Sequence, residues 1–290
     1  MKLFTYRTIL SIRKLFFQLG IRRRYVFFGP CLDKRITQRL FKSLCIDNQR
    51  MLVSNAKKKD KYSQSLPVPV FMHIPKTAGS SIGELLENKV SRTDFYTTIE
   101  RPEDGYDNER FKLAVNNPDI KIIQGHFDSR LLEIIERPYF AFTFLRDPVD
   151  HVVSFYYYIK NHPKHSQFSL IQERDMNLSE IYRTTPPPLL DNLQVRYLCG
   201  KPSTKLSEED LEQAKTNLRS KFELVGTLDN LDAAIVRLSR LLNLSKQATI
   251  QHINVGKHRP HFEEVPKATR DAIEEHNSFS RELYEYAKSL

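Results

Sequence analysis

The stretch from Val68 to Asn88 constrains the fold most, because it has the pattern of a buried strand, a small-residue loop and a helix in direct succession. Val68–Met72 is an apolar run typical of a strand inside a sheet. A loop over 73–79 follows, and 80–88 then has the pattern of a helix. A helix that begins directly after a strand offers unpaired N–H groups and the positive end of its dipole, which together bind an anion. The stretch therefore predicts an α/β domain with an anion site at its first strand-to-helix turn.

Further short strands alternate with helices along the chain. Strands are expected at Ile120–Gln124, Tyr139–Leu145 and Phe222–Gly226. Asp147 can cap the helix that follows the second of these, and Pro148 suits its first turn. Later helices are expected over 191–198, 208–218, 231–242 and 267–287. This alternation predicts a P-loop-like, three-layer α/β fold in which helices flank a short central parallel sheet.

The positive charge of the chain is concentrated at its beginning. The 290 residues carry a net charge of +10, but residues 1–65 alone hold 16 Lys and Arg against 3 Asp and Glu. We therefore expect a basic N-terminal extension over 1–65 and the main domain over 66–290. Apolar residues at helical spacing in the extension fit a segment lying on an anionic membrane surface, and equally a solvated or partly ordered arm. The near-neutral remainder gives no reason to expect nucleic acid as a partner.

The cysteines and the early apolar run bear on the compartment. Cys31, Cys45 and Cys199 are odd in number and far apart, so they form neither a disulfide framework nor a metal-ligand pattern. Arg7 and Arg13 interrupt the early apolar run, which fits neither a membrane span nor a cleavable signal. The sequence thus favours a cytoplasmic protein, free or at the membrane periphery, and disfavours the Golgi lumen. No metal is expected.

The loop of the first anion site carries the chemistry that such a site needs. Small residues let the backbone approach an anion, hydroxyls donate to it, and a lysine adds a mobile positive charge. The residues concerned are Lys76, Thr77, Ala78, Gly79, Ser80 and Ser81. The order differs from a Walker A loop, in which glycine precedes the lysine. An ordinary strand-to-helix turn is the alternative interpretation.

The run from His73 to Ser81, HIPKTAGSS, resembles the 5′-phosphosulfate loop of sulfotransferases that use 3′-phosphoadenosine 5′-phosphosulfate (PAPS). The pattern is most similar to the carbohydrate sulfotransferases of the heparan sulfate 2-O and 6-O type and their bacterial counterparts. The resemblance covers about residues 68–288 and is strongest in two motifs. It implies PAPS as the donor and 3′-phosphoadenosine 5′-phosphate (PAP) as the product. It also implies that the six loop residues bind the donor and that Lys76 assists the leaving group.

The second motif runs from Arg146 to Ser154 and resembles the 3′-phosphate segment of the same family. Arg146 stands at the end of an expected strand, and its planar guanidinium suits phosphate binding. Ser154 lies about two helical turns further on, so a phosphate could lie between the two side chains. The family often has arginine where this chain has His151, which weakens one expected phosphate contact. A structural Arg–Asp turn is the alternative.

A histidine after the second expected strand is the candidate general base. The resemblance places the base in the Gly-His pair, which makes His126 the predicted catalytic residue. His73 and His151 are weaker candidates, and a purely structural histidine is the alternative.

Two later segments resemble parts of the family's substrate sites. Gln194 and Arg196 match a helix that borders the acceptor, so they are predicted to bind substrate, with a surface helix as the alternative. Lys257 and Arg259 match a late loop that closes over PAPS, with a solvated charge cluster as the alternative.

Together these patterns predict a sulfotransferase that transfers a sulfuryl group from PAPS to an acceptor hydroxyl by in-line displacement. The resemblance favours a carbohydrate or polysaccharide acceptor over protein tyrosine or a lipid. Two other functions stay open: a P-loop kinase-like nucleotide enzyme that needs Mg²⁺, and a non-catalytic relative that binds PAP.

Overall fold

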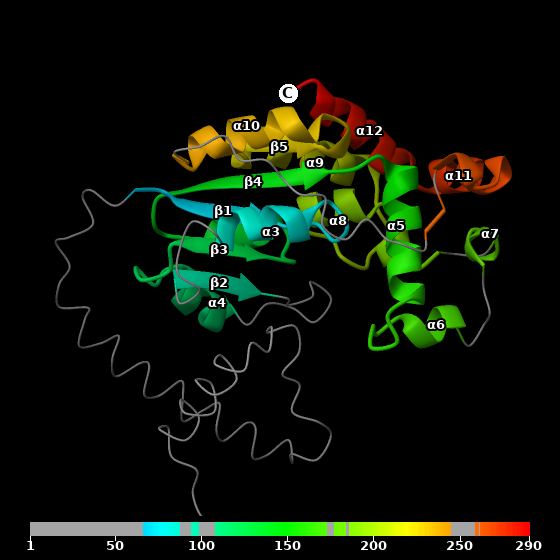
Figure 1. The fold of residues 1–290 in the computed structure, drawn as a ribbon, viewed down its shortest axis with the longest axis horizontal. Coiled ribbons are helices and arrows are strands. Elements are labelled where there is room, and N and C mark those ends of the chain that lie inside the picture. Colours follow the sequence, from blue (N-terminus) through cyan, green and yellow to red (C-terminus); the bar gives the residue numbers. More distant parts are fainter. Residues whose placement is uncertain are drawn as a thin grey trace, which may run out of the picture. The chain divides into compact units, whose positions relative to one another are not determined.

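A computed structural model describes residues 66–87, 94–98, 108–172, 177–183, 186–244, 259–260 and 262–290. The expectations for the extension over 1–65 and for Lys257 lie outside these residues. Five parallel strands form one sheet in the order β2-β3-β1-β4-β5 (Figure 1). The strands are β1 (Val68–Met72), β2 (Phe95–Thr98), β3 (Ile122–Gly125), β4 (Tyr139–Leu145) and β5 (Leu224–Thr227).

Helices connect and cover these strands. The described α-helices are α3 (Gly79–Glu87), α4 (Asn108–Val115), α5 (Pro148–Lys160), α6 (Phe168–Gln172), α7 (Leu178–Ile181), α8 (Leu193–Cys199), α9 (Glu208–Lys221), α10 (Leu231–Leu241), α11 (Lys267–His276) and α12 (Ser278–Lys288). Short 3₁₀ turns lie at Ser129–Ile134, Pro188–Leu190, Leu228–Asn230 and Phe262–Glu264. The predicted α/β class, with a parallel sheet between helices, is confirmed. None of the described helices is long and apolar enough to cross a membrane.

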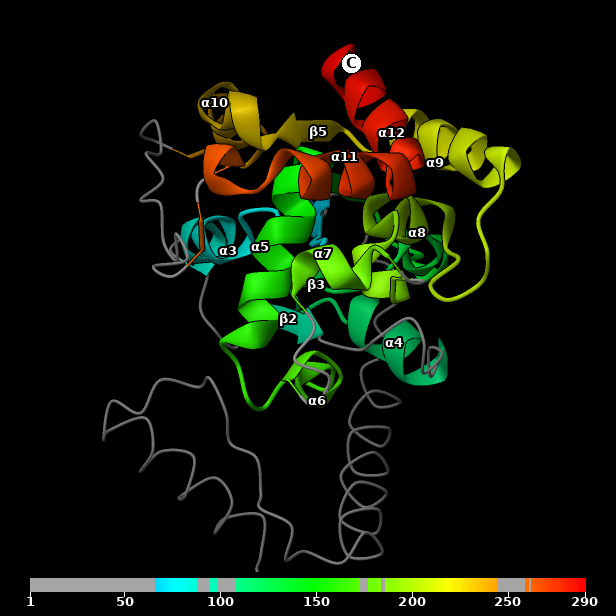
Figure 2. The same ribbon diagram turned by 90° about the vertical axis from the view of Figure 1, so that its right-hand side faces the viewer.

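The sheet separates two apolar clusters because side chains alternate between its faces along each strand. Phe71, Phe142 and Phe144 pack with buried residues of α3 and α10. The ring centroids of Phe71 and Phe142 lie 5.0 Å apart in a stacked arrangement. Met72 and Leu145 point to the other face, where α4, α5, α8, α9 and α12 contribute to the larger cluster. Figure 2 shows α3 and α10 on one side of the sheet and α4, α8 and α9 on the other.

Strand β1 occupies the middle of the sheet, between β3 and β4. All five strands run in the same direction, so the residues that follow β1, β3 and β4 meet at one edge. Figure 1 shows α5 at the end of the sheet to which the arrows point. The topology thus brings the two sequence motifs and the predicted base to the same place.

Two expectations about secondary structure need correction. Phe95–Thr98 forms the edge strand β2, which the sequence analysis missed, because four residues with two threonines carry little apolar signal. The helix expected over 267–287 is two helices that break at Asn277. The buried side chain of Asn277 accepts a hydrogen bond from Asn192 N at 2.7 Å and donates to Leu190 O at 3.3 Å. These contacts with a distant segment outweigh helical continuity.

Candidate donor site

The carboxyl ends of β1 and β3 are joined directly by backbone and side chain. His73 N donates to Gly125 O at 2.9 Å, which carries the pairing of the two strands into the loop. His126 follows Gly125, and its ring centroid lies 4.4 Å from that of His73. The segment that begins the predicted donor loop therefore lies against the predicted base.

The loop between β1 and α3 has an unusual backbone. Lys76 and Ala78 have φ angles of 69° and 63°, in the left-handed region that is uncommon for residues with a side chain. Gly79 opens α3 where the ring of His73 packs against it. A Cβ atom at Gly79 would lie 1.8 Å from His73 Nε2, so a larger residue here would force the ring of His73 to move. The loop therefore packs closely against the N-terminus of α3, the predicted place for an anion.

Two residues of the second motif hold this loop by its carbonyl groups. Arg146 Nη1 donates to Lys76 O at 3.0 Å. His151 Nε2 lies 2.7 Å from Pro75 O, and because a carbonyl only accepts, this nitrogen carries the proton. The two motifs, about 70 residues apart in sequence, thus form one unit.

Asp150 is a residue of this unit that the sequence analysis missed. Its carboxylate lies 2.6 Å from Arg146 Nη2 and 2.6 Å from Arg259 Nη1. Burial raises the pKa of Asp150, but Arg146 and Arg259 together hold it below its usual value. The spacing of four residues between Arg146 and Asp150, one helical turn, was the available signal. Asp150 fixes the guanidinium of Arg146 and brings the predicted late-loop residue Arg259 beside it.

Lys76 lies in a partly buried, positively charged environment. Burial, and then the charges of Arg146 and Arg259, lower the pKa of Lys76 from 10.5 to about 8. Its ammonium group therefore remains charged at neutral pH, but is less firmly protonated than an exposed lysine. The three cations Lys76, Arg146 and Arg259 outnumber the carboxylate of Asp150, so the local field is positive and suited to an anionic donor.

The hydrogen bonds of His126 define which of its nitrogens can act as a base. His126 Nδ1 lies 2.8 Å from His73 O, so Nδ1 carries the proton of the neutral ring. The lone pair is then on Nε2, which is the atom able to accept a proton. The ring of His126 is thus oriented by a backbone carbonyl of the predicted donor loop, and its role as the base stays a prediction.

One family model matches residues 68–287 and is described as the sulfotransferase family. This chain belongs to that family. The match confirms the resemblance to PAPS-dependent sulfotransferases that the two motifs indicated. Among solved structures, this chain is similar to the mouse sulfotransferase SULT7A1 complexed with PAP, with 13% sequence identity and a TM-score of 0.34. The match covers 77% of this chain and 68% of the mouse chain. A search of the curated proteins found no match.

The remaining predicted donor residues of this sulfotransferase lie in the loop after β1, on α3 and on α5. Ser80 is exposed in the first turn of α3, and Ser81 beside it is buried. Thr77 is fully buried, and its hydroxyl donates to Ile74 O at 2.8 Å, so its side chain shapes the loop. Ser154 is buried on α5, two helical turns after Arg146. The loop is thus held from within by Thr77, and the serines lie on the two helices that flank it.

Gln194 and Arg196, the predicted acceptor ligands, make internal contacts instead. Gln194 Oε1 accepts from Arg146 N at 2.9 Å, and Gln194 Nε2 donates to Arg146 O at 2.8 Å. Arg196 pairs with Asp191 and donates to Thr204 O at 2.6 Å. Both residues are buried, at 1% and 3% exposure, and their role in binding an acceptor stays a prediction. Gln194 instead positions the backbone of Arg146.

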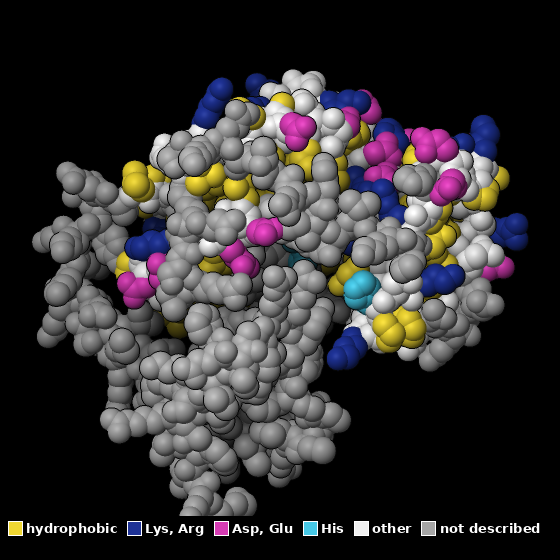
Figure 3. Space-filling view, viewed as in Figure 1, with side chains coloured by type: hydrophobic (Ala, Val, Ile, Leu, Met, Phe, Trp, Pro, Cys, Tyr) yellow, Lys and Arg dark blue, Asp and Glu magenta, His cyan; other side chains and the backbone are white. Residues whose placement is uncertain are grey.

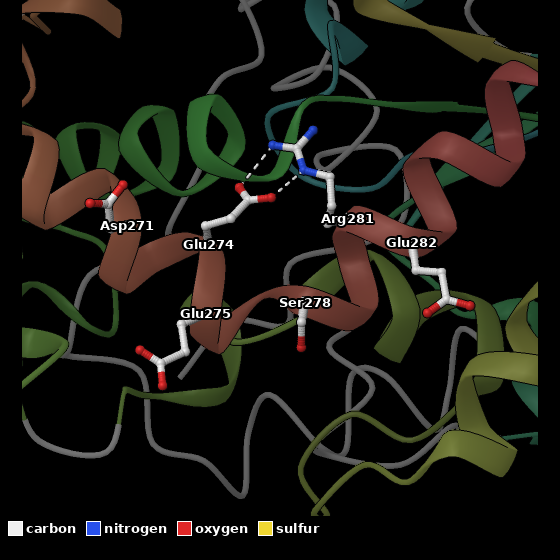
Figure 4. Close-up of a pocket in the computed structure, with 6 residues that line it drawn as sticks. All are labelled: Asp271, Glu274, Glu275, Ser278, Arg281 and Glu282. Atoms are coloured by element: carbon white, nitrogen blue, oxygen red, sulfur yellow. Dashed lines mark hydrogen bonds and ion pairs between the residues drawn. The ribbon is translucent and has the colours of Figure 1, made fainter.

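A cavity of about 590 Å³ in the sulfotransferase is lined by residues of α11 and α12, and one of them, Arg281, also pairs with Asp147 of the second motif at 2.7 Å. Figure 4 shows its lining residues: Asp271, Glu274, Glu275, Ser278, Arg281 and Glu282. Arg281 points to Glu274, with its Nη2 2.9 Å from Glu274 Oε2. Four carboxylates against one guanidinium give the lining of this cavity a net negative charge, which disfavours an anionic donor.

The surface of the sulfotransferase carries charges of both signs close together. In the described part of the face drawn in Figure 3, basic and acidic side chains lie next to one another. Among the described residues, no group of three or more His, Cys, Asp or Glu could hold a metal ion. Lys76, Arg146 and Arg259 remain the predicted ligands of an anionic donor.

The contact between His151 and the loop predicts a pH-dependent stability. Burial lowers the pKa of His151 from 6.5 to about 4. Between these values the unfolded chain binds a proton that the folded chain excludes, so stability is lost as pH falls from 6.5 towards 4. The loss amounts to about 2 kcal/mol by pH 5. His151→Gln keeps a donor for Pro75 O but does not titrate, so it should lose less stability.

Urea unfolding at pH 7 and pH 5 checks this prediction. His73, whose pKa burial also lowers, is present in both proteins, so the difference isolates His151. His276→Gln, an exposed histidine at the end of α11, is the matched control and should behave as wild type. An acid loss in His151→Gln equal to that of wild type would contradict the assignment.

Proposed function

We propose that this sulfotransferase domain moves the sulfuryl group of PAPS to a hydroxyl of a carbohydrate acceptor, with His126 as the general base. One observation carries the proposal: the 3.0 Å hydrogen bond from Arg146 Nη1 to Lys76 O, which joins the two predicted anion sites. PAPS presents a 5′-phosphosulfate and a 3′-phosphate on one nucleotide. A donor of that kind needs two anion sites held at a fixed spacing, and a hydrogen bond between the two predicted sites supports such an arrangement.

The donor would lie with its 5′-phosphosulfate at the N-terminus of α3. The amide groups of Gly79 and Ser80 and the hydroxyls of Ser80 and Ser81 would bind its oxygens. Arg146 and Ser154 would bind the 3′-phosphate. Asp150 Oδ2 accepts a hydrogen bond from Arg146 Nε at 2.6 Å. This contact orients the guanidinium of Arg146, whose remaining N–H groups would bind the phosphate.

Transfer is a single in-line displacement at sulfur. The acceptor oxygen forms a bond to sulfur while the bond from sulfur to the bridging 5′-phosphate oxygen breaks. The proton of the acceptor hydroxyl passes to His126 Nε2. The ammonium of Lys76 stabilises the negative charge that develops on the bridging oxygen. PAP and the sulfated acceptor are the products, and the charges balance.

A carbohydrate acceptor is proposed from the resemblance of the two motifs to carbohydrate sulfotransferases. The experiment supplies [³⁵S]PAPS with three candidates: chemically desulfated heparin, a tyrosine peptide, and buffer alone. We expect label in the polysaccharide and the release of PAP. Label in the peptide would overturn the carbohydrate acceptor but would still support sulfuryl transfer from PAPS. If PAPS stays intact with all three and the protein instead transfers a phosphoryl group from ATP in the presence of Mg²⁺, the proposal that PAPS is the donor is wrong as well.

A further inference from the structure

The side chain of Lys76 ends on an aromatic ring of α5. Lys76 Nζ lies 4.3 Å from the ring centroid of Tyr158, within the distance at which an ammonium is attracted to an aromatic face. Lys76 belongs to the loop after β1, and Tyr158 belongs to the third turn of α5. The contact therefore connects the lysine of the first motif to a residue beyond the second motif.

Tyr158 lies on the face of α5 that holds the donor loop. His151, Ser154 and Tyr158 follow one another at spacings of three and four residues, so they share one side of the helix. His151 Nε2 donates to Pro75 O at one end of this face. Tyr158 receives Lys76 at the other end, and Ser154 lies between them. The same helix face thus holds the loop backbone and the loop lysine.

The ring of Tyr158 is itself held in place. The ring of His162 lies 4.0 Å from it between centroids, and the rings of His165 and Phe155 lie at 5.8 and 6.3 Å. His162 Nδ1 also donates to Tyr158 O at 2.6 Å, which ties the next turn to Tyr158. A ring packed against three neighbours keeps its orientation, so it can define the position of the ammonium that it contacts.

An aromatic face suits the electrostatics of this place. Lys76 faces charged or titratable groups on the surrounding elements: Arg146 before α5, Arg259 on the late segment, His73 after β1 and His151 on α5. A carboxylate at position 158 would hold the ammonium firmly, but it would also repel the anionic donor. The π face attracts the ammonium and adds no net charge.

We propose that Tyr158 is a positioning residue for the transfer reaction, which holds the ammonium of Lys76 against its ring at the donor loop. The inference rests on the proposed function, because it concerns the lysine that assists the leaving group. Tyr158 acts through Lys76 and need not touch the donor.

Three variants test the proposal in the full chain. Tyr158→Leu removes the ring face, and Tyr158→Phe keeps it. Tyr157→Leu removes the adjacent ring, which lines a separate cavity of about 460 Å³ with Leu178 and Pro260. The rate of [³⁵S]PAPS consumption with desulfated heparin should fall about 2- to 30-fold in Tyr158→Leu, the range of cation–π energies. The fall should be in kcat, with little change in the Kd of PAP. Tyr158→Phe should restore most of the rate, and Tyr157→Leu should lose none.

A second measurement needs no acceptor, and its first part uses the wild-type tyrosine. In protein labelled with ¹³C at the lysine ε carbon, the Lys76 signal is assigned by its absence in Lys76→Arg. In the wild-type protein the ε protons should be shifted upfield by the ring current of Tyr158. In Tyr158→Leu that shift should vanish and the pKa of Lys76 should fall further below 8, because the attraction of the ring for the ammonium is lost.

The outcomes separate this inference from the function on which it rests. If Lys76→Ala is inactive but Tyr158→Leu keeps wild-type kcat, the positioning role is wrong and the function stands. If Lys76→Ala keeps full activity, the proposed function fails first. An unshifted Lys76 signal in wild-type protein would also overturn the proposal, even if Tyr158→Leu does not fold.

Discussion

Replacing His126 by alanine should reduce sulfuryl transfer to the acceptor by about 10²- to 10⁴-fold, the usual contribution of a positioned general base. The hydrogen bond from Nδ1 to His73 O, at 2.8 Å, leaves Nε2 as the proton acceptor, and alanine removes it. The Kd of PAP should change little, because His126 is not among the groups assigned to the two phosphate sites. Initial rates with [³⁵S]PAPS and calorimetric titration with PAP measure the two effects.

A matched control for His126→Ala is His276→Ala, which removes an exposed ring at the end of α11. It should retain the wild-type rate. A His126→Ala enzyme that transfers sulfuryl groups at the wild-type rate would contradict the assignment of the base. It would also favour the interpretation of His126 as a structural residue that packs against His73.

Replacing Lys76 by alanine should reduce the transfer rate by about 10²- to 10³-fold, the cost of removing one group that stabilises developing charge. The loop itself should survive, because its contacts to Arg146 and His151 use the carbonyl groups of Lys76 and Pro75. The thermal stabilisation that PAP gives should shrink but not vanish, since the 3′-phosphate ligands remain. Steady-state rates and melting curves of the same preparation check both expectations.

The pH dependence of the rate provides a separate test of Lys76. Its pKa is lowered to about 8, first by burial and then by Arg146 and Arg259. The charged form is present below this value and is lost above it, so the wild-type rate should fall as pH rises through 8. Lys76→Arg, which stays charged, should show no such fall, although its absolute rate is lower. A wild-type rate that stays level from pH 7 to pH 10 would contradict a role for the ammonium.

Local sequence signals predicted the part of the site that depends on consecutive residues. The pattern at 68–88 contained a strand, a tight loop and a helix start, and β1 and α3 lie there within one residue of the expected bounds. The pair Asp147-Pro148 predicted a helix cap, and Asp147 Oδ1 accepts from Val149 N at 3.0 Å. Such features depend on neighbours in the chain, so the sequence displays them directly.

Contacts between distant segments could not be predicted in the same way. The bond from His151 to Pro75 and the contact of Tyr158 with Lys76 join residues more than 70 positions apart. Gln194 and Arg196 were matched to an acceptor helix by type, but burial directs their polar groups inward. A motif gives the kind of side chain at a position, whereas packing decides what that side chain contacts.

The most direct test of the central claim is the binding of PAP without metal, measured as thermal stabilisation of the wild-type chain and of Arg146→Ala. We expect a clear rise in Tm for the wild type at millimolar PAP, and a much smaller rise for Arg146→Ala, which lacks the proposed main ligand of the 3′-phosphate. EDTA should not change the result. Stabilisation by ATP with Mg²⁺ and none by PAP would contradict the proposed donor site, because it would indicate a kinase-like nucleotide site in its place.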